Sequence, residues 1–343
     1  MASYSSDQDP GKAEQPAPNP LFARYRAEVE KRLTETYSAD GWISAAAGEA
    51  IRAGGKRLRP IVAILTCEAI CGNPEPAFPV AMSYELAHAA SLIQDDIIDE
   101  STVRHASPTA HARYGLARAI MLSDSMIFEI FTLLARYQAT ELPKDGLVRL
   151  LEFMGTAAGL AAEGEMTEVA LSRRGEITTE EYVKIAGQKT GALFAAAAAS
   201  GAVVARADRA LVERMYDFGL SLGVAFQIGD DILDIKGDTK TTGKPLFKDV
   251  QNNAGNVLLI HALSKADAFQ KSAINSLLFK KWFTSLEVDR LLSILKQLGS
   301  FDYATALLEA QIARCRSILR DLPRSYARDA LEELTKSLDV RKE

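Results

Sequence analysis

The chain has 343 residues, of which 48% are hydrophobic and 25% are charged, as in an ordinary globular protein with a sizeable core. Its formal net charge of −5 gives no reason to expect a nucleic-acid partner, and its three cysteines are too few for a disulfide framework. No early apolar run resembles a signal peptide, and no run of about 18 uncharged apolar residues would cross a bilayer, so we expect a cytoplasmic protein.

The sequence pattern predicts a polar tail followed by helices. Residues 1–19 are polar and rich in Pro, Ser and Asp, and we expect them to form a disordered tail. From about Leu21 onward, apolar residues recur at helical spacing and alternating β-branched runs are scarce. Residues 20–343 are therefore expected to form a single all-α domain, a bundle of long helices. The predicted helices are 21–37, 43–53, 60–71, 77–100, 116–139, 146–172, 179–202, 207–236, 253–276, 286–297, 301–321 and 324–340.

Two segments of this domain differ from an ordinary amphipathic helix. Residues 192–206, ALFAAAAASGAVVAR, have almost no polar face, which indicates a helix buried among other helices. Residues 237–252 form the longest irregular stretch of the chain. A polar loop of that size beside an acidic cluster is a candidate lid, although an ordinary connector is an alternative.

Two acidic clusters repeat one pattern at the end of an apolar helix. The sequences SLIQDDIIDE and FQIGDDILDI each place aspartates at positions i, i+1 and i+4, so the first and third side chains lie on one helix face. Like charges packed there repel unless a cation neutralises them, and oxygen ligands of this kind select Mg²⁺. The alternative is a pair of solvated acidic helix ends. The six aspartates are Asp95, Asp96, Asp99, Asp230, Asp231 and Asp234.

Four motifs in order resemble those of the trans-isoprenyl diphosphate synthases, also called polyprenyl synthetases. They are GGKRLRP at 54–60, ELAHAASLIQDDIID at 85–99, QKTGALF at 188–194 and FQIGDDILDIKGD at 226–238, within a likeness that covers about residues 22–340. The resemblance implies a helical bundle around a deep central cavity with metals at its mouth. It also implies prenyl diphosphate substrates, three Mg²⁺ ions per site and a homodimer.

The resemblance further implies a reaction in which an allylic prenyl diphosphate ionises and alkylates isopentenyl diphosphate. Negative charge grows on the departing oxygens, and a metal cluster between two acidic helices can take up that charge. Asp95, Asp99 and Asp230 are the first candidates for metal ligands. Asp96 and Asp234 follow as ligands or as partners of the ligands.

Cationic side chains are expected to hold the allylic diphosphate directly. Arg104, Lys189 and Lys244 stand at the positions where the family grips this group, and Thr190 is counted with them. Each cation could instead be an ordinary surface charge. That alternative is weaker for Lys189, because it precedes the nearly all-apolar segment and is costly there unless it is paired.

The resemblance places a second diphosphate, that of isopentenyl diphosphate, on side-chain cations without metal. Lys56 and Arg59 fit this role together with His88, although a lone histidine is more often a satisfied core residue. We expect Arg57 to be a surface charge. Gln227 is expected just above the second aspartate cluster, near the reacting carbons.

Several residues depart from the family pattern. His105 replaces an arginine that binds the second diphosphate, and a largely neutral imidazole cannot form a bidentate contact. Residues 253–257 lack a lysine usual in the family, Gln94 replaces a histidine, and Glu165 and Glu168 stand where Gln and Asp are typical. These changes leave two alternatives besides a non-catalytic partner subunit: an elongating enzyme, and a terpene synthase-like enzyme that cyclises or quenches the cation.

The residues upstream of the first cluster bear on the length of the product. In the family, bulk at these positions forms the floor of the pocket for the prenyl tail. Ala87, Ala90 and Ser91 are small, so Tyr84 is the first large candidate and could close a pocket for about twenty carbons, an estimate from helix rise. The alternative for Tyr84 is an ordinary core tyrosine.

Overall fold

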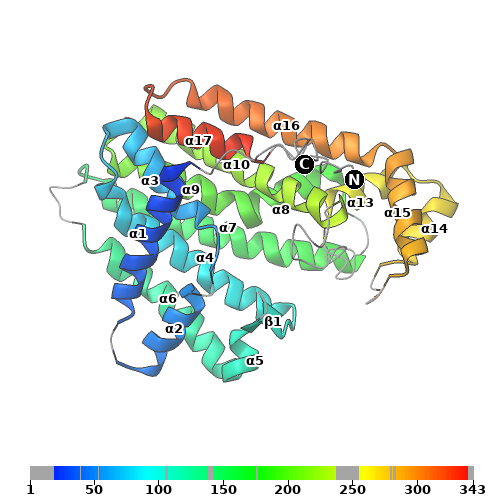
Figure 1. Ribbon diagram of the computed structural model, residues 1–343, viewed down its shortest axis with the longest axis horizontal. Helices are drawn as coiled ribbons and strands as arrows, with labels where there is room; N and C mark the ends of the chain where they lie inside the picture. Colours follow the sequence, from blue (N-terminus) through cyan, green and yellow to red (C-terminus); the bar gives the residue numbers. More distant parts are fainter. Residues whose placement is uncertain are drawn as a thin grey trace, which may run out of the picture.

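The computed structural model describes residues 19–38, 40–52, 54–104, 107–137, 142–174, 177–236, 255–278, 280 and 283–338. Within these ranges the chain is a bundle of helices, which confirms the all-α prediction (Figure 1). A short antiparallel hairpin pairs β1 (Val103–Arg104) with β2 (Ser107–Pro108). The helices are α1 (Pro20–Thr36), α2 (Trp42–Arg52), α3 (Leu58–Cys71), η1 (Glu75–Ala77), α4 (Phe78–Ile98), α5 (Ala110–Tyr114), α6 (Leu116–Leu134), α7 (Gly146–Arg174), α8 (Thr179–Ala186), η2 (Gly187–Gly191), α9 (Ala192–Val204), α10 (Arg209–Lys236), α13 (Val257–Lys265), α14 (Ala268–Asn275), α15 (Ser285–Gln297), α16 (Ser300–Leu319) and α17 (Tyr326–Lys336).

Helix α9 forms the centre of the bundle, as its lack of a polar face predicts. Every one of its residues is buried, and it packs against α3, α4, α7 and α10 (Figure 1). Two glycines, Gly201 of α9 and Gly219 of α10, allow the backbones of neighbouring helices to approach closely. A Cβ added to Gly219 would lie 2.3 Å from the carbonyl oxygen of Phe194, and one added to Gly201 would lie 2.3 Å from that of Ala63. This close packing fixes α9 against α10 and α3.

The predicted helix over residues 179–202 is interrupted by a π-helical turn. This turn, η2, is wider than an α-helical turn and joins α8 to α9. Its side chains reach two neighbours: Lys189 contacts α7, and Thr190 contacts α10. Such turns are frequent at functional sites.

Two other predicted boundaries also differ from the structure. The predicted helix 253–276 is divided into α13 and α14 at Asp267, whose side chain accepts from the backbone N–H of Gln270. The Gln270 side chain accepts in return from the N–H of Asp267, which completes a capping box. At the other end, Asn19 caps α1 and donates to Glu333 of α17, so the helical domain includes this residue. The rest of the predicted tail lies outside the described residues.

The buried side chains form a large apolar cluster among α1, α3, α4 and α9, and a second around α10, α13, α15 and α16. Among the described residues, no helix has both the length and the hydropathy that crossing a bilayer requires. The most apolar helix, α9, is instead buried inside the bundle.

Candidate active site

A cavity of about 280 Å³ opens between α4, α6, α7 and α9. Asp95, Glu165 and Lys189 are the charged residues of its lining, Ser91 and Gln94 are polar, and the rest is apolar or glycine. Both Glu165 and Leu151 of α7 line the cavity, and their separation of 14 positions corresponds to roughly 21 Å of helix. The shape is that of a long apolar pocket with a charged mouth.

The first aspartate cluster lies at this mouth, at the end of α4. Asp95 lines the cavity, and burial together with the nearby charge of Glu165 raises its pKa to about 6. Asp99, at the C-cap of the helix, is exposed. Asp96 instead is buried and accepts a hydrogen bond from Nε of Arg104 at 2.9 Å. The i and i+4 positions are therefore available to a ligand, while the i+1 position anchors Arg104.

In the second cluster, near the end of α10, the middle aspartate is again the buried one. Asp231 is buried and accepts from Nε2 of Gln227 at 2.9 Å and from the backbone N–H of Val257 at 2.8 Å. Asp230 and Asp234 are partly exposed. Asp231, the middle aspartate of the predicted second cluster, thus holds the first turn of α13.

Lys189 of η2 lies between two glutamates of α7. Its Nζ is 2.6 Å from Oε2 of Glu165 and 2.6 Å from Oε2 of Glu168. Burial lowers the pKa of Lys189, but the charges of Glu168 and Glu165 outweigh it and raise the pKa above its ordinary value. Lys189 is thus paired with two glutamates in its apolar setting, and its contact with the allylic diphosphate stays a prediction.

The two aspartate clusters are connected through consecutive residues of η2. Lys189 contacts Glu165, whose charge acts on Asp95 of the first cluster. Thr190 donates to Oε1 of Gln227 at 2.9 Å, and Gln227 donates to Asp231 of the second. Both clusters therefore border the region around η2.

A separate group of cations lies beside two aromatic rings. The Nζ of Lys56 is 5.7 Å from the ring centroid of Phe226, and the guanidinium carbon of Arg59 is 4.7 Å from that of Phe194. The ring centroids of Phe194 and Phe226 are 6.0 Å apart. Burial, followed by the charge of Arg59, lowers the pKa of His88 well below its ordinary value, so the imidazole is neutral.

Arg59 carries the strongest sign of a missing ligand. Burial lowers its pKa to about 10, against the opposing charges of Glu85 and Asp95. Its Nε is buried and has no hydrogen-bond partner among the residues that the structure describes. A buried, unsatisfied charged donor is costly, so this position suits an anionic ligand.

Comparison with known proteins agrees with this geometry. The family model for polyprenyl synthetase matches residues 40–295. The chain belongs to the polyprenyl synthetase family. It is 34% identical to the geranylfarnesyl diphosphate synthase of Aeropyrum pernix over 283 residues, which cover 82% of this chain and 88% of that protein.

Two solved structures of this family are also similar. The geranylgeranyl pyrophosphate synthetase of Pyrococcus horikoshii has a TM-score of 0.87 at 32% identity, and the match covers 93% of this chain and 98% of that one. A polyprenyl synthase of Caulobacter crescentus, complexed with calcium and isoprenyl diphosphate, has a TM-score of 0.82 at 29% identity and covers 94% and 97%. The expected membership of this family is confirmed.

The donor set of this polyprenyl synthetase fits Mg²⁺ bound together with a diphosphate. Within the described ranges, no three Asp, Glu, His or Cys side chains converge closely enough to hold an ion by themselves. Mg²⁺ in such sites is usually held by one or two carboxylates, water and substrate phosphates. Asp95 and Asp99, one helical turn apart at the end of α4, are carboxylates of the kind that such a site needs, and burial with the charge of Glu165 raises the pKa of Asp95 to about 6.

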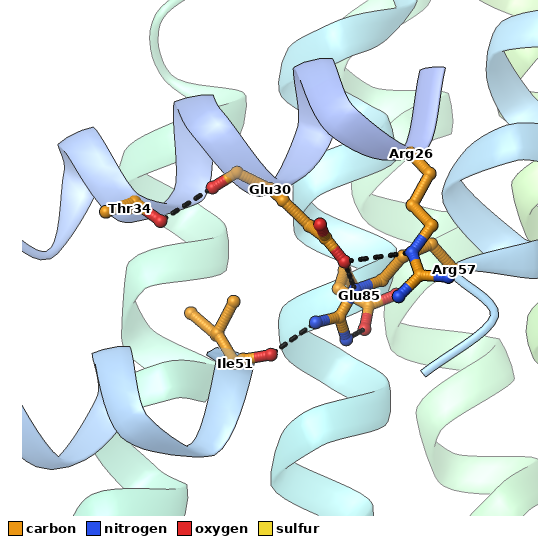
Figure 2. A network of polar contacts seen from close by, with 6 residues as sticks. All are labelled: Arg26, Glu30, Thr34, Ile51, Arg57 and Glu85. Carbon is orange, nitrogen blue, oxygen red and sulfur yellow. Dashed lines mark hydrogen bonds and ion pairs between the residues drawn. The ribbon is translucent and has the colours of Figure 1, made fainter. Parts of the chain in front are cut away.

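The expectation that Arg57 is a surface charge is wrong. Only 4% of its side chain is exposed, and it forms ion pairs with Glu85 and Glu30 (Figure 2). One sequence signal could have revealed this. Glu85 is a carboxylate inside an otherwise apolar helix, FPVAMSYELAHAASLI, and such a group needs a buried cation.

The expectation that Tyr84 closes the cavity is not supported, since Tyr84 is absent from the cavity lining. Its side chain is fully buried, and its hydroxyl lies 2.9 Å from Oγ of Ser200 on α9. Tyr84 is therefore an ordinary core tyrosine, which was the alternative interpretation. His105, Lys244 and the candidate lid at 237–252 lie outside the described residues.

Proposed function

We propose that this polyprenyl synthetase condenses an allylic prenyl diphosphate with isopentenyl diphosphate to give a trans-polyprenyl diphosphate of about twenty carbons or more. The observation that carries the proposal is Arg59, whose buried Nε has no hydrogen-bond partner among the described residues, and on which the charge of Asp95 at the cavity mouth acts. An enzyme that only ionises one diphosphate has no use for a second anion site. The names of the similar synthases, and a cavity of roughly 21 Å along α7, support the length.

Different residues of the site would perform different parts of the proposed reaction. Asp95, Asp99, Asp230 and Asp234 would hold three Mg²⁺ ions, which supply positive charge where the departing diphosphate oxygens become negative. Lys189 adds direct positive charge at the cavity mouth. The apolar walls exclude water from the allylic cation while the π electrons of the isopentenyl double bond form the new carbon–carbon bond. The tertiary cation that results then loses a proton to the released diphosphate and becomes an alkene again.

Incubation of the purified protein with Mg²⁺ and an allylic diphosphate, with and without isopentenyl diphosphate, tests this function. We expect longer diphosphates only when both substrates are present, measured by chromatography and mass spectrometry. A hydrocarbon or alcohol formed from the allylic diphosphate alone would show the terpene synthase-like alternative. Absence of turnover with either mixture would contradict both.

We also propose that the protein is a homodimer. Large apolar side chains share one face of α6: Met121 is 53% exposed, Phe128 66% and Phe131 55%. Leu147 and Val148 of α7, exposed by 37% and 66%, continue the apolar surface, which a second copy would cover.

Phe128→Asp is expected to convert the dimer into a monomer, because it places a charge in the proposed contact. Multi-angle light scattering after gel filtration would measure the mass of both proteins. Leu286→Asp, at a position 79% exposed on the remote helix α15, is the matched control and should remain dimeric. A parent protein with the mass of one chain would contradict the proposal.

Tyr84→Phe is expected to leave the product length unchanged, because Tyr84 does not line the cavity and only its hydrogen bond to Ser200 is lost. Ala87→Phe should shorten the products, since Ala87 does line the cavity on the same helix. Chromatography of the products from the two variants measures both effects. Lengthened products from Tyr84→Phe would restore Tyr84 to the floor of the pocket.

A further inference from the structure

The loop that carries Lys56 and Arg59 is anchored by the residue between them. Arg57 precedes α3 with a φ of 52°, in the left-handed region. Its Nη1 lies 2.5 Å from Oε1 of Glu85, its Nε lies 3.3 Å from Oε1 of Glu30, and its Nη2 donates to the carbonyl oxygen of Ile51 (Figure 2). One guanidinium thereby joins the start of α3 to α1, α2 and α4.

Glu85 retains a second carboxylate oxygen that could accept from another cation. Its side chain is 3% exposed, and its Oε2 is buried without a hydrogen-bond partner among the described residues. The Nε of Arg59 is a buried donor in the same condition. The charge of Glu85 acts on Arg59, where it opposes the fall in pKa caused by burial. Two buried groups of opposite charge, each incompletely satisfied, therefore lie within electrostatic reach of each other.

Arg57 already holds Oε1 of Glu85 and supplies a positive charge to this carboxylate. Removing one partner of a buried ion pair leaves the other charge uncompensated, and it then seeks a new partner. Arg59, two residues from Arg57, is a cation on which the charge of Glu85 already acts. If it turned to Glu85, it would leave the position beside Phe194, where we place the second diphosphate.

We propose that Arg57 is a positioning residue that neutralises Glu85 and so keeps the guanidinium of Arg59 free to bind the diphosphate of isopentenyl diphosphate. This inference rests on the proposed function of the same site. It differs from a merely structural role in one respect. If the ion pair only braced the loop, loss of either partner would be equally harmful. If Arg57 shields Arg59 from Glu85, loss of Arg57 is harmful and loss of the Glu85 charge is not.

Steady-state kinetics of Arg57→Met, Glu85→Gln and the double variant test this asymmetry. Arg57→Met should raise the KM for isopentenyl diphosphate by about tenfold or more, the ratio expected when one charged hydrogen bond is lost. The KM for the allylic diphosphate should change by less than about twofold, since it is bound elsewhere. Glu85→Gln should stay within about twofold of the parent, and the double variant should return to within about threefold.

A second readout does not depend on turnover. Titration calorimetry with isopentenyl diphosphate in metal-free buffer should show weaker binding to Arg57→Met and near-parental binding to the double variant. Arg32→Met is the matched control. Arg32 also pairs with two glutamates, Glu28 and Glu75, and lies over the ring of Phe78, but away from the cavity lining. It should leave both KM values unchanged.

Equal damage from Arg57→Met and Glu85→Gln, without recovery in the double variant, would overturn the proposal in favour of a brace. If Arg57→Met does not fold, Glu85→Gln alone decides, because a tenfold rise in its KM would contradict shielding. Arg57→Lys, which keeps a cation beside Glu85, should stay within about threefold of the parent. A parent protein that does not elongate would instead overturn the proposed function, which separates the two failures.

Discussion

Asp95→Ala and Asp230→Ala are each expected to lower kcat by at least about a thousandfold, the scale seen when one group that stabilises developing negative charge is removed. Asp95 lines the cavity mouth, and Asp230 occupies the first position of the second cluster. Each would supply carboxylate oxygens for the ions that stabilise the departing diphosphate. Release of pyrophosphate from an allylic diphosphate with isopentenyl diphosphate measures the loss.

Asp289→Ala is the matched control for this prediction. Asp289 is an exposed aspartate of α15, away from the cavity lining, and its variant should keep the parental rate. Removal of divalent ions with a chelator should stop the parent reaction, and added Mg²⁺ should restore it. Parental rates in the two cluster variants would show that neither carboxylate takes part.

Gly219→Ala is expected to destabilise the fold by about 3 kcal/mol, near the upper end for overpacking of a tight core. The new Cβ would lie 2.3 Å from the carbonyl oxygen of Phe194 and 2.6 Å from Cα of Ala195, and neither backbone atom can move without shifting α9. Urea unfolding followed by circular dichroism measures the change in the free energy of unfolding.

Gly159→Ala provides the comparison, because Gly159 lies in α7 with no atom within 4 Å of an added Cβ. Alanine there should be neutral or stabilise by up to about 1 kcal/mol, since it favours the helix over the unfolded chain. Equal stability of the two variants would mean that α9 and α10 can separate at low cost.

Features set by local pattern were predictable from the sequence. The apolar composition of residues 192–206 was enough to place α9 inside the bundle, and the cost of burying a lone cation was enough to predict that Lys189 is paired. The motifs were sufficient to identify the family, because their chemistry requires particular side chains in a particular order.

Features that depend on which residues meet across the fold were not predictable in this way. The helical spacing that places Tyr84 three turns above Asp95 says nothing of its hydroxyl bonding to Ser200, 116 residues later. The charge of Arg57 suggested that its side chain is exposed to solvent, but the side chain is buried and pairs with two glutamates from other helices. Asp267 and Gln270 form a capping pattern that could have predicted the break between α13 and α14. The apolar periodicity continues on both sides of it, so the sequence pattern predicted one continuous helix.

The wide turn η2 has a consequence for comparing this chain with its relatives. A π turn holds more residues than an α turn, so the helical phase of α8 does not continue into α9. Deleting one residue there would rotate everything on one side by about 100° relative to the other. Lys189 would then no longer face Glu165 and Glu168. An alignment gap of a single position in this turn therefore indicates that the residue aligned with Lys189 has different neighbours on α7.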